Sequence, residues 1–109
     1  MGFINLASVV GGGARLRFRF DLVGTKQTAV SGRDVTGRFV EDAVLANAVD
    51  KVNGNFTLSV ETRKPVYSRF NMPQPGYDFV DSERVYYPLA EDGAEVDRFL
   101  ILYHYFDRD

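Results

Sequence analysis

The segment of residues 16–39 limits most strongly what this chain can fold into, because it begins with a strictly alternating pattern. The apolar residues stand at every second position: Leu16, Phe18, Phe20 and Leu22. The positions between and before them are charged: Arg15, Arg17, Arg19 and Asp21. A period of two is that of a β-strand with one face on a core and the other in water. The arginine row is therefore expected to be a solvated outer face of a sheet.

Short helices linked by glycines are expected after this strand. Thr25 can cap a helical turn over residues 26–30, which Gly32 would end. Thr36 can cap another turn over residues 39–44. The chain therefore does not pass directly from this strand into a neighbouring one.

The residues before residue 16 predict a first strand. Residues 3–10 are apolar at almost every position, which is typical of a strand that is buried on both faces or lies at an edge. Three glycines, Gly11 to Gly13, then break the strand, so the two strands are expected to form a hairpin. A phosphate-binding glycine loop would need a helix start or a Lys-Ser/Thr pair after it, and Arg15 and a strand follow instead.

Residues 45–63 fit two structures. One helical stripe, at steps of four, three, four and four, would contain Leu45, Val49, Val52, Phe56 and Val60. Against a helix stand the pair Asn53-Gly54, a strong hairpin-turn signal, and the alternating apolar residues after it. Periodicity places the helix only slightly ahead of the hairpin, and the length of the segment before Pro65 favours the helix a little further.

From Pro65 onward the pattern predicts three strands, over residues 66–72, 79–89 and 96–106, with a loop at residues 73–76. The predicted order is two strands, short helices, one longer helix and three strands. Five antiparallel strands must cover one sheet face with those helices, which gives an α+β fold. With 109 residues, the whole range 1–109 is expected to form a single domain.

Composition excludes several kinds of site and partner. The chain has no cysteine, so it has no disulfide, thiolate metal site or cysteine chemistry. Its net charge of -2 gives no basic excess for binding a nucleic acid or an anionic membrane. An apolar run of about 20 residues, as a transmembrane helix needs, is absent, and so is a secretory signal. We expect a cytoplasmic protein.

Several short patterns, in this order along the chain, resemble the PAS sensory domain, and in particular a bacterial PAS subfamily. Residues 17–25 resemble a strand ending "RFRLVGT", and residues 32–38 resemble "GRDLTGR". Residues 64–67 resemble "RPVY", and residues 86–93 and 96–100 resemble "LPLSDDG" and the last strand of the family. The resemblance implies a PAS-like five-stranded antiparallel sheet, with short helices and one longer helix between strands 2 and 3. It also implies that residues 45–63 are helical.

PAS domains bind haem, flavin or small metabolites between sheet and helices, or bind nothing and dimerise. The resemblance implies no flavin-thiol chemistry here, because residues 32–39 contain no cysteine. It also implies no haem of the common kind, because residues 45–63 contain no histidine. An unidentified small ligand remains open, and its candidate pocket residues are Phe20, Val30, Phe39, Val49, Val52, Phe56 and Tyr87. Aromatic residues with one hydroxyl suit a small ring-bearing ligand, although the same residues also simply fill a core.

The last strand is apolar on both faces. One row consists of Phe99, Ile101, Tyr103 and Tyr105, and the other of Leu100, Leu102, His104 and Phe106. With helices on one side of the sheet, one row would face water unless something covers it. We therefore expect a homodimer through the outer sheet face, with Leu100, Leu102, His104 and Phe106 at its interface.

The predicted function is that of a non-enzymatic sensory or protein-interaction module that passes its output to a downstream signalling protein. His104, the one histidine, has no second ligand at a recognisable spacing, so no metal site and no catalytic triad are expected. One alternative is a purely structural dimerisation domain. Another is a small curved-sheet enzyme of the ketosteroid-isomerase kind, which would need an acid/base carboxylate inside the sheet, with Asp81 and Glu83 as the residues considered.

Overall fold

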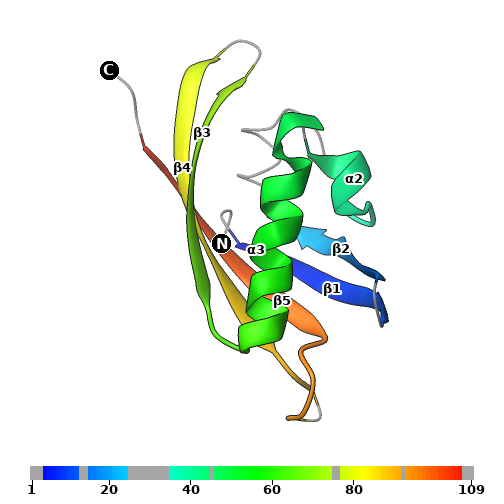
Figure 1. The fold of residues 1–109 in the computed structure, drawn as a ribbon. Coiled ribbons are helices and arrows are strands. Elements are labelled where there is room, and N and C mark those ends of the chain that lie inside the picture. Colours follow the sequence, from blue (N-terminus) through cyan, green and yellow to red (C-terminus); the bar gives the residue numbers. More distant parts are fainter. Residues whose placement is uncertain are drawn as a thin grey trace.

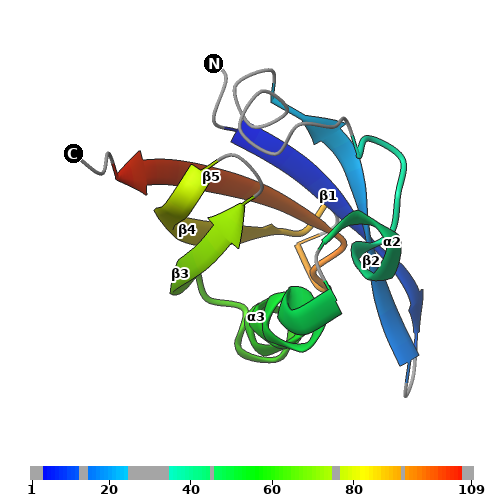
Figure 2. The same cartoon turned by 90° about the horizontal axis from the view of Figure 1, so that it is seen from above.

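The fold is one curved antiparallel sheet with helices on its concave side (Figure 1). The computed structural model describes residues 4–12, 15–24, 35–44, 46–74, 77–91 and 93–106. The elements in chain order are β1 (Ile4–Gly12), β2 (Arg15–Val23), α2 (Val40–Ala43), the 3₁₀ turn η1 (Ala46–Ala48), α3 (Val49–Thr62), β3 (Val66–Gln74), β4 (Tyr77–Leu89) and β5 (Arg98–Phe106). The strands lie in the order β2-β1-β5-β4-β3, so the first and last strands, β1 and β5, are neighbours within the sheet. Figure 2 shows the sheet curving around α3. The predicted α+β fold, with one longer helix between strands 2 and 3, is confirmed.

The ambiguous segment is a helix. α3 runs from Val49 to Thr62, and the hairpin that Asn53-Gly54 could have formed is not present. The apolar stripe decided the outcome, because Val52 and Phe56 are fully buried against the sheet. Burial of such side chains contributes about 1.5–3 kcal/mol each, which exceeds the cost of about 1 kcal/mol for a glycine inside a helix.

The C-terminal end of α3 turns the chain directly into β3. Arg63 adopts the left-handed conformation with φ 58°, and its N–H donates to the carbonyl of Ser59. The buried hydroxyl of Ser59 donates in turn to the carbonyl of Lys64 at 2.7 Å. Pro65 then prevents the helix from continuing. These contacts fix the start of β3 beneath the helix.

A bulge in β2 changes which residues face the core. Leu6 pairs with Leu22, but the next residue of β1, Ala7, pairs with Phe20, so Asp21 is extra. Such an insertion shifts the alternation by one residue. Phe18 and Phe20 are buried as predicted, whereas Leu22 is 53% exposed on the outer face and Val23 is buried in its place. The prediction that Leu22 shares the core face was therefore wrong.

The first strand is neither buried on both faces nor at an edge. β1 lies between β2 and β5, with Asn5 and Ala7 buried toward the helices and Leu6 exposed on the other side. Strand β2 forms an edge instead. A short bridge from Arg19 to Phe39, with the Phe20 N–H donating to the carbonyl of Arg38, occupies part of that edge. Pairing of this kind limits association through the edge.

The short helices agree with the prediction in part. α2 covers residues 40–43 and buries Val40 completely. Its N-cap is Phe39, which makes no side-chain capping bond, so the N-cap lies three residues after Thr36, the predicted cap. The turn predicted over residues 26–30 lies outside the described residues. In the described part of the chain, no helix is long and apolar enough to cross a membrane.

The size of the aromatic core leads to the first test. Phe56 has no exposed surface, and its ring meets four others. We expect Phe56→Ala to lower the free energy of unfolding by about 3–5 kcal/mol. The substitution leaves a cavity, because the surrounding side chains of the sheet relax only partly into the space of the lost ring. Urea unfolding followed by circular dichroism measures this. Leu58→Ala, on the exposed side of the same helix, is the control, and a similar loss there would contradict the assignment of the buried face.

Two glycines give a matched pair for the second test. Gly54 is helical and a Cβ there meets no atom within 4 Å, whereas Gly37 has the same free space but φ +84°. We expect Gly54→Ala to stabilise the protein by about 0.5–1 kcal/mol, because alanine favours the helix. Gly37→Ala is expected to destabilise it by about 1 kcal/mol or more, since only the backbone is strained. Thermal unfolding of both variants checks the opposite signs, and equal signs would refute the argument.

Candidate functional site

The space between α3 and the sheet holds most of the predicted pocket residues. Phe20, Val52 and Phe56 are buried there, and Val49 is half-buried and packs against the core. Phe39 lies instead at the edge of β2, where it bridges to Arg19 and the Arg17 guanidinium lies 3.8 Å from its ring centroid. Val30 lies outside the described residues. Burial of these side chains is what a packed core also produces.

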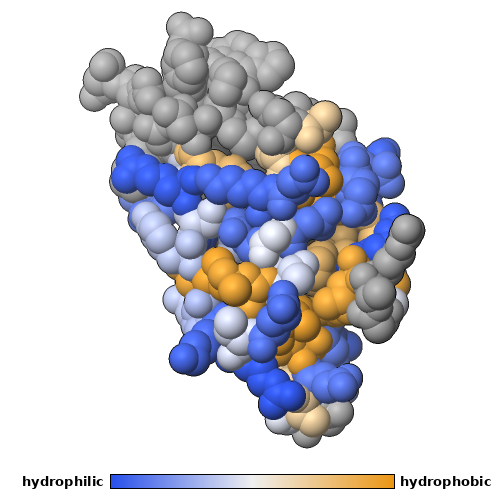
Figure 3. All heavy atoms as spheres, in the orientation of Figure 1, coloured by the Kyte–Doolittle hydropathy of each residue, from blue (hydrophilic) through white to orange (hydrophobic). Residues whose placement is uncertain are grey.

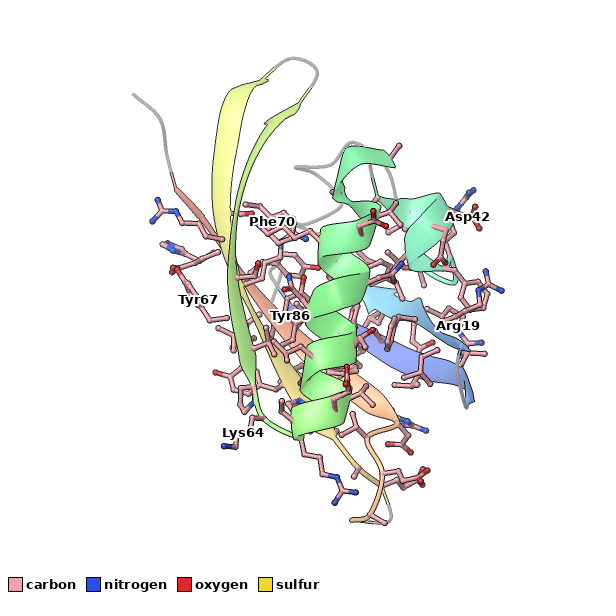
Figure 4. The ribbon with its side chains drawn as sticks, in the orientation of Figure 1. Arg19, Asp42, Lys64, Tyr67, Phe70 and Tyr86 are labelled. Atoms are coloured by element: carbon pink, nitrogen blue, oxygen red, sulfur yellow. The ribbon has the colours of Figure 1, made fainter. Side chains whose placement is uncertain are left out.

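Tyr87 is a correction within this set. It lies on the outer face and is 37% exposed, whereas its neighbour Tyr86 is 1% exposed and faces α3. Tyr86 pairs with buried Ile101, so its side chain lies on the same inner face of the sheet and that of Tyr87 on the outer face. Figure 4 shows Tyr86 between the sheet and α3.

Aromatic rings fill the centre of this space. The rings of Phe56 and Phe18 are stacked with their centroids 4.7 Å apart. Phe99 and Tyr86 meet the Phe56 ring edge to face at 4.9 and 5.0 Å. Such distances are those of rings in contact. Around Phe56 the inner space is therefore core.

A polar group of residues lies beside this core, at the N-terminal half of α3. It is formed by Arg84 and Tyr86 of β4 with Lys51 and Asn55 of α3, and we refer to it as the inner polar cluster. The guanidinium of Arg84 stacks at 3.9 Å from the centroid of Phe70, and the Lys51 ammonium lies 4.3 Å from the same centroid. Phe70 is buried and faces α3 (Figure 4). Two cations thus share one aromatic ring.

Buried donors of this cluster lack acceptors. Within the cluster, Arg84 Nε, Asn55 Nδ2 and the Tyr86 hydroxyl are buried and meet no hydrogen-bond partner among the described residues. The acceptor Asn53 Oδ1, on α3 outside the cluster, is the other buried atom without a partner there. The nearby Asn5 differs, because its amide donates to the Tyr103 hydroxyl at 3.1 Å and its oxygen accepts the Gly24 N–H. Native proteins pair nearly all buried polar groups, so unpaired donors on the facing elements β4 and α3 require an explanation.

Sequence reasoning missed the inner polar cluster. Residues 82, 84 and 86 alternate with the more apolar row of residues 85, 87 and 89, so the pattern favoured the wrong row for the core. The signal in the sequence that could have identified the cluster was Tyr86. Arg84 stands two positions before it and therefore lies on the same face of the strand. Only the register between β4 and β5 shows that these side chains face α3.

The outer face of the sheet carries two apolar rows that run across the strands. In the first, Leu6 pairs with Leu22 on one side and with Leu100 on the other, and Leu100 pairs with Tyr87. In the second, Leu102 pairs with Ile4 and Val85, and Val85 pairs with Tyr67. We call these eight residues the outer apolar patch: Ile4, Leu6, Leu22, Tyr67, Val85, Tyr87, Leu100 and Leu102.

Much of the exposed apolar surface lies in this patch. Leu6, Leu22, Tyr67, Tyr87 and Leu102 are all exposed, by 37 to 59%. The α3 side of the molecule, seen in Figure 3, mixes hydrophilic and apolar areas. Contiguous apolar patches of this kind are uncommon on the surface of soluble monomeric proteins.

A polar network borders the patch. The hydroxyl of Tyr67 donates to Glu83 Oε2 at 2.6 Å, and His104 Nδ1 lies 3.2 Å from Glu83 Oε1. The bond to Tyr67 lowers the pKa of Glu83 below its usual value, and the same bond raises the pKa of Tyr67. These three residues lie on the outer face, and Tyr67 points away from α3 (Figure 4). Glu83 is therefore not a carboxylate inside the curved sheet, where the enzyme alternative needs one.

The other predicted residues of the last strand are divided by the described range. Leu100, Leu102 and His104 lie on the outer face, opposite buried Phe99 and Ile101, as predicted. The side chain of Phe106 lies outside the described residues, and so does that of Asp81. Within the described part of the chain, no three His, Asp or Glu residues cluster in a way that could hold a metal ion.

Comparison with known proteins gives a fold but no close relative. No family model matches the sequence, and no curated protein matches it. The solved structure described as "Structure of RsLOV D109G", in which the substitution is that protein's own, superposes with a TM-score of 0.65 at 11% identity. The match covers 98% of this chain and 62% of that one, so this chain spans less than two thirds of its length.

LOV domains are members of the PAS family. The likeness, the strand order and the helix between strands 2 and 3 together show that the chain has a PAS-like fold.

Proposed function

We propose that this chain is a non-enzymatic sensory or protein-interaction module of PAS type, which self-associates through the outer apolar patch. In this proposal a small ligand binds between α3 and the sheet, and a partner protein receives the signal. The PAS-like fold supports the sensory role. The observation that carries the proposal is the outer apolar patch, whose two rows cross four strands without a charged residue between them.

A second copy of the chain is the occupant that we favour for the patch. An isologous pair places the same surface on both partners, so one contact covers two patches at once. Each copy would bury large side chains such as Leu22 and Tyr67, which are more than half exposed. Burial contributes about 25 cal/mol for each Å² of apolar surface removed from water.

We also propose that the chain belongs to the bacterial PAS subfamily with the patterns "GRDLTGR" and "RPVY". Residues 35–38 and 64–67 of these patterns lie in the described part of the chain, at the edge of β2 and at the start of β3. In this arrangement they hold the helices against the sheet. The proposal rests on the sequence patterns, since the likeness to a known structure concerns the fold.

A purely structural dimerisation domain is the alternative function that differs least from the proposed sensory module. It shares the patch but needs no ligand. The unpaired buried donors of the inner polar cluster favour the sensory version, because a structural core has no use for them.

Self-association is tested by placing a charge in the patch. We expect the wild-type protein to have twice the 12.3 kDa mass of one chain in light scattering at micromolar concentration. Leu102→Glu is expected to give the monomer, because a carboxylate there would be buried without a partner in the dimer.

The matched control is Leu58→Glu, which places the same charge on the exposed side of α3 and is expected to leave the dimer intact. A wild-type monomer, or a Leu102→Glu variant that remains dimeric with an unchanged circular dichroism spectrum, would contradict the proposed interface.

A further inference from the structure

We infer that the inner polar cluster binds a small organic carboxylate that carries a flat apolar group. This inference rests on the proposed sensory function and names the chemical class of its ligand. It is drawn from three features of the cluster: the sign of its charge, the kind of polar groups left unpaired, and the rings around them.

The first feature is unneutralised positive charge. Arg84 and Lys51 approach the ring of Phe70 at 3.9 and 4.3 Å. Among the described residues the ion pairs join other partners, and neither of these two cations takes part in one. Lys51 is exposed and donates to the carbonyl of Arg69, whereas Arg84 is half-buried against the rings of Phe70 and Tyr103. An anion beside Arg84 would therefore meet a positive charge that no described carboxylate neutralises.

The second feature is that the unpaired groups next to these cations are donors. Arg84 Nε–H, Asn55 Nδ2–H and the Tyr86 O–H can all donate, and each lacks an acceptor in the described structure. A carboxylate has only acceptors, about four lone-pair sites on two oxygens. It is therefore complementary both to the charge and to the unpaired hydrogens of this cluster.

The elements bring the three donors to one region. Arg84 and Tyr86 are successive inward positions of β4, about 7 Å apart along a strand. Asn55 lies one helical turn after Lys51, whose ammonium donates to the carbonyl of Arg69 on β3. Ser68, which precedes Arg69 on β3, pairs with Arg84, so Arg84 lies beside the part of β3 that Lys51 contacts.

The third feature is the aromatic surroundings. Arg84 also lies 4.9 Å from the ring centroid of Tyr103, and Tyr86 packs on Phe56 at 5.0 Å. Figure 4 shows Phe70 and Tyr86 along the same side of the sheet, facing α3. Rings at both ends of the cluster suit a flat apolar group attached to the carboxylate.

The test compares benzoate with benzamide and with inorganic phosphate by titration calorimetry on the whole chain. We expect benzoate to bind about tenfold or more tightly than benzamide, because the amide lacks the charge and offers one acceptor oxygen instead of two. Phosphate, which has charge but no ring, is expected to bind more weakly than benzoate. Equal affinities for benzoate and benzamide, or no benzoate binding, would overturn the inference.

Two variants locate the site. Arg84→Gln is expected to weaken benzoate binding about tenfold or more, whereas Arg69→Gln, on the outer face of the neighbouring strand, should leave it unchanged. Tyr86→Phe should weaken binding and at the same time raise, or leave unchanged, the melting temperature of the ligand-free protein, because it removes a buried hydroxyl without a partner. A lower melting temperature would show that the hydroxyl has a partner without ligand, and would overturn the inference.

Light scattering on the same samples separates this inference from the proposed function. A dimer that does not bind benzoate would overturn the carboxylate site and leave self-association standing. A monomer that binds benzoate through Arg84 would support the site and contradict the proposed dimer.

Discussion

The seating of Phe56 in the concave face of the sheet is the contact on which the rest of this structure depends. Its ring stacks on Phe18 of β2 and meets Phe99 and Tyr86 of β5 and β4. One side chain of α3 thus contacts three strands. Because the helix is held at this point, the sheet has a covered side and an uncovered one, and every assignment of inner and outer residues follows from it.

The two faces then carry different chemistry. The inner face combines a ring-filled centre with buried donors that lack acceptors, at the end of the helix where Lys51 and Arg84 lie. The outer face carries the outer apolar patch, bordered by the network of Tyr67, Glu83 and His104. A ligand on one face and a second chain on the other would be separated only by the thickness of β4 and β5. This arrangement gives a short physical route between the two proposed sites.

Local pattern predicted the elements well where one period dominated. The alternating residues of β2 and the pattern of the last strands identified those elements, and the order of elements led to the α+β fold. For α3 the apolar stripe placed the helix only slightly ahead of a hairpin, and the resemblance to PAS domains added to it. The pattern predicted the wrong inward residue where two adjacent residues were equally suited to burial. Tyr86 and Tyr87 are the same residue type, and Leu22 and Val23 are both apolar, so nothing local decides which member of each pair is buried.

The sequence by itself determined that no cysteine chemistry occurs here, that strands flank a helical segment, and that the last strand has two apolar faces. Only the tertiary structure decided that Asp21 is an extra residue that turns Leu22 outward, and that Tyr86 rather than Tyr87 faces α3. The physical reason is that a one-residue change of register exchanges the two faces of a strand. Register is set by pairing between residues far apart in the chain, such as Tyr86 with Ile101, and a pattern within one strand contains no information about it.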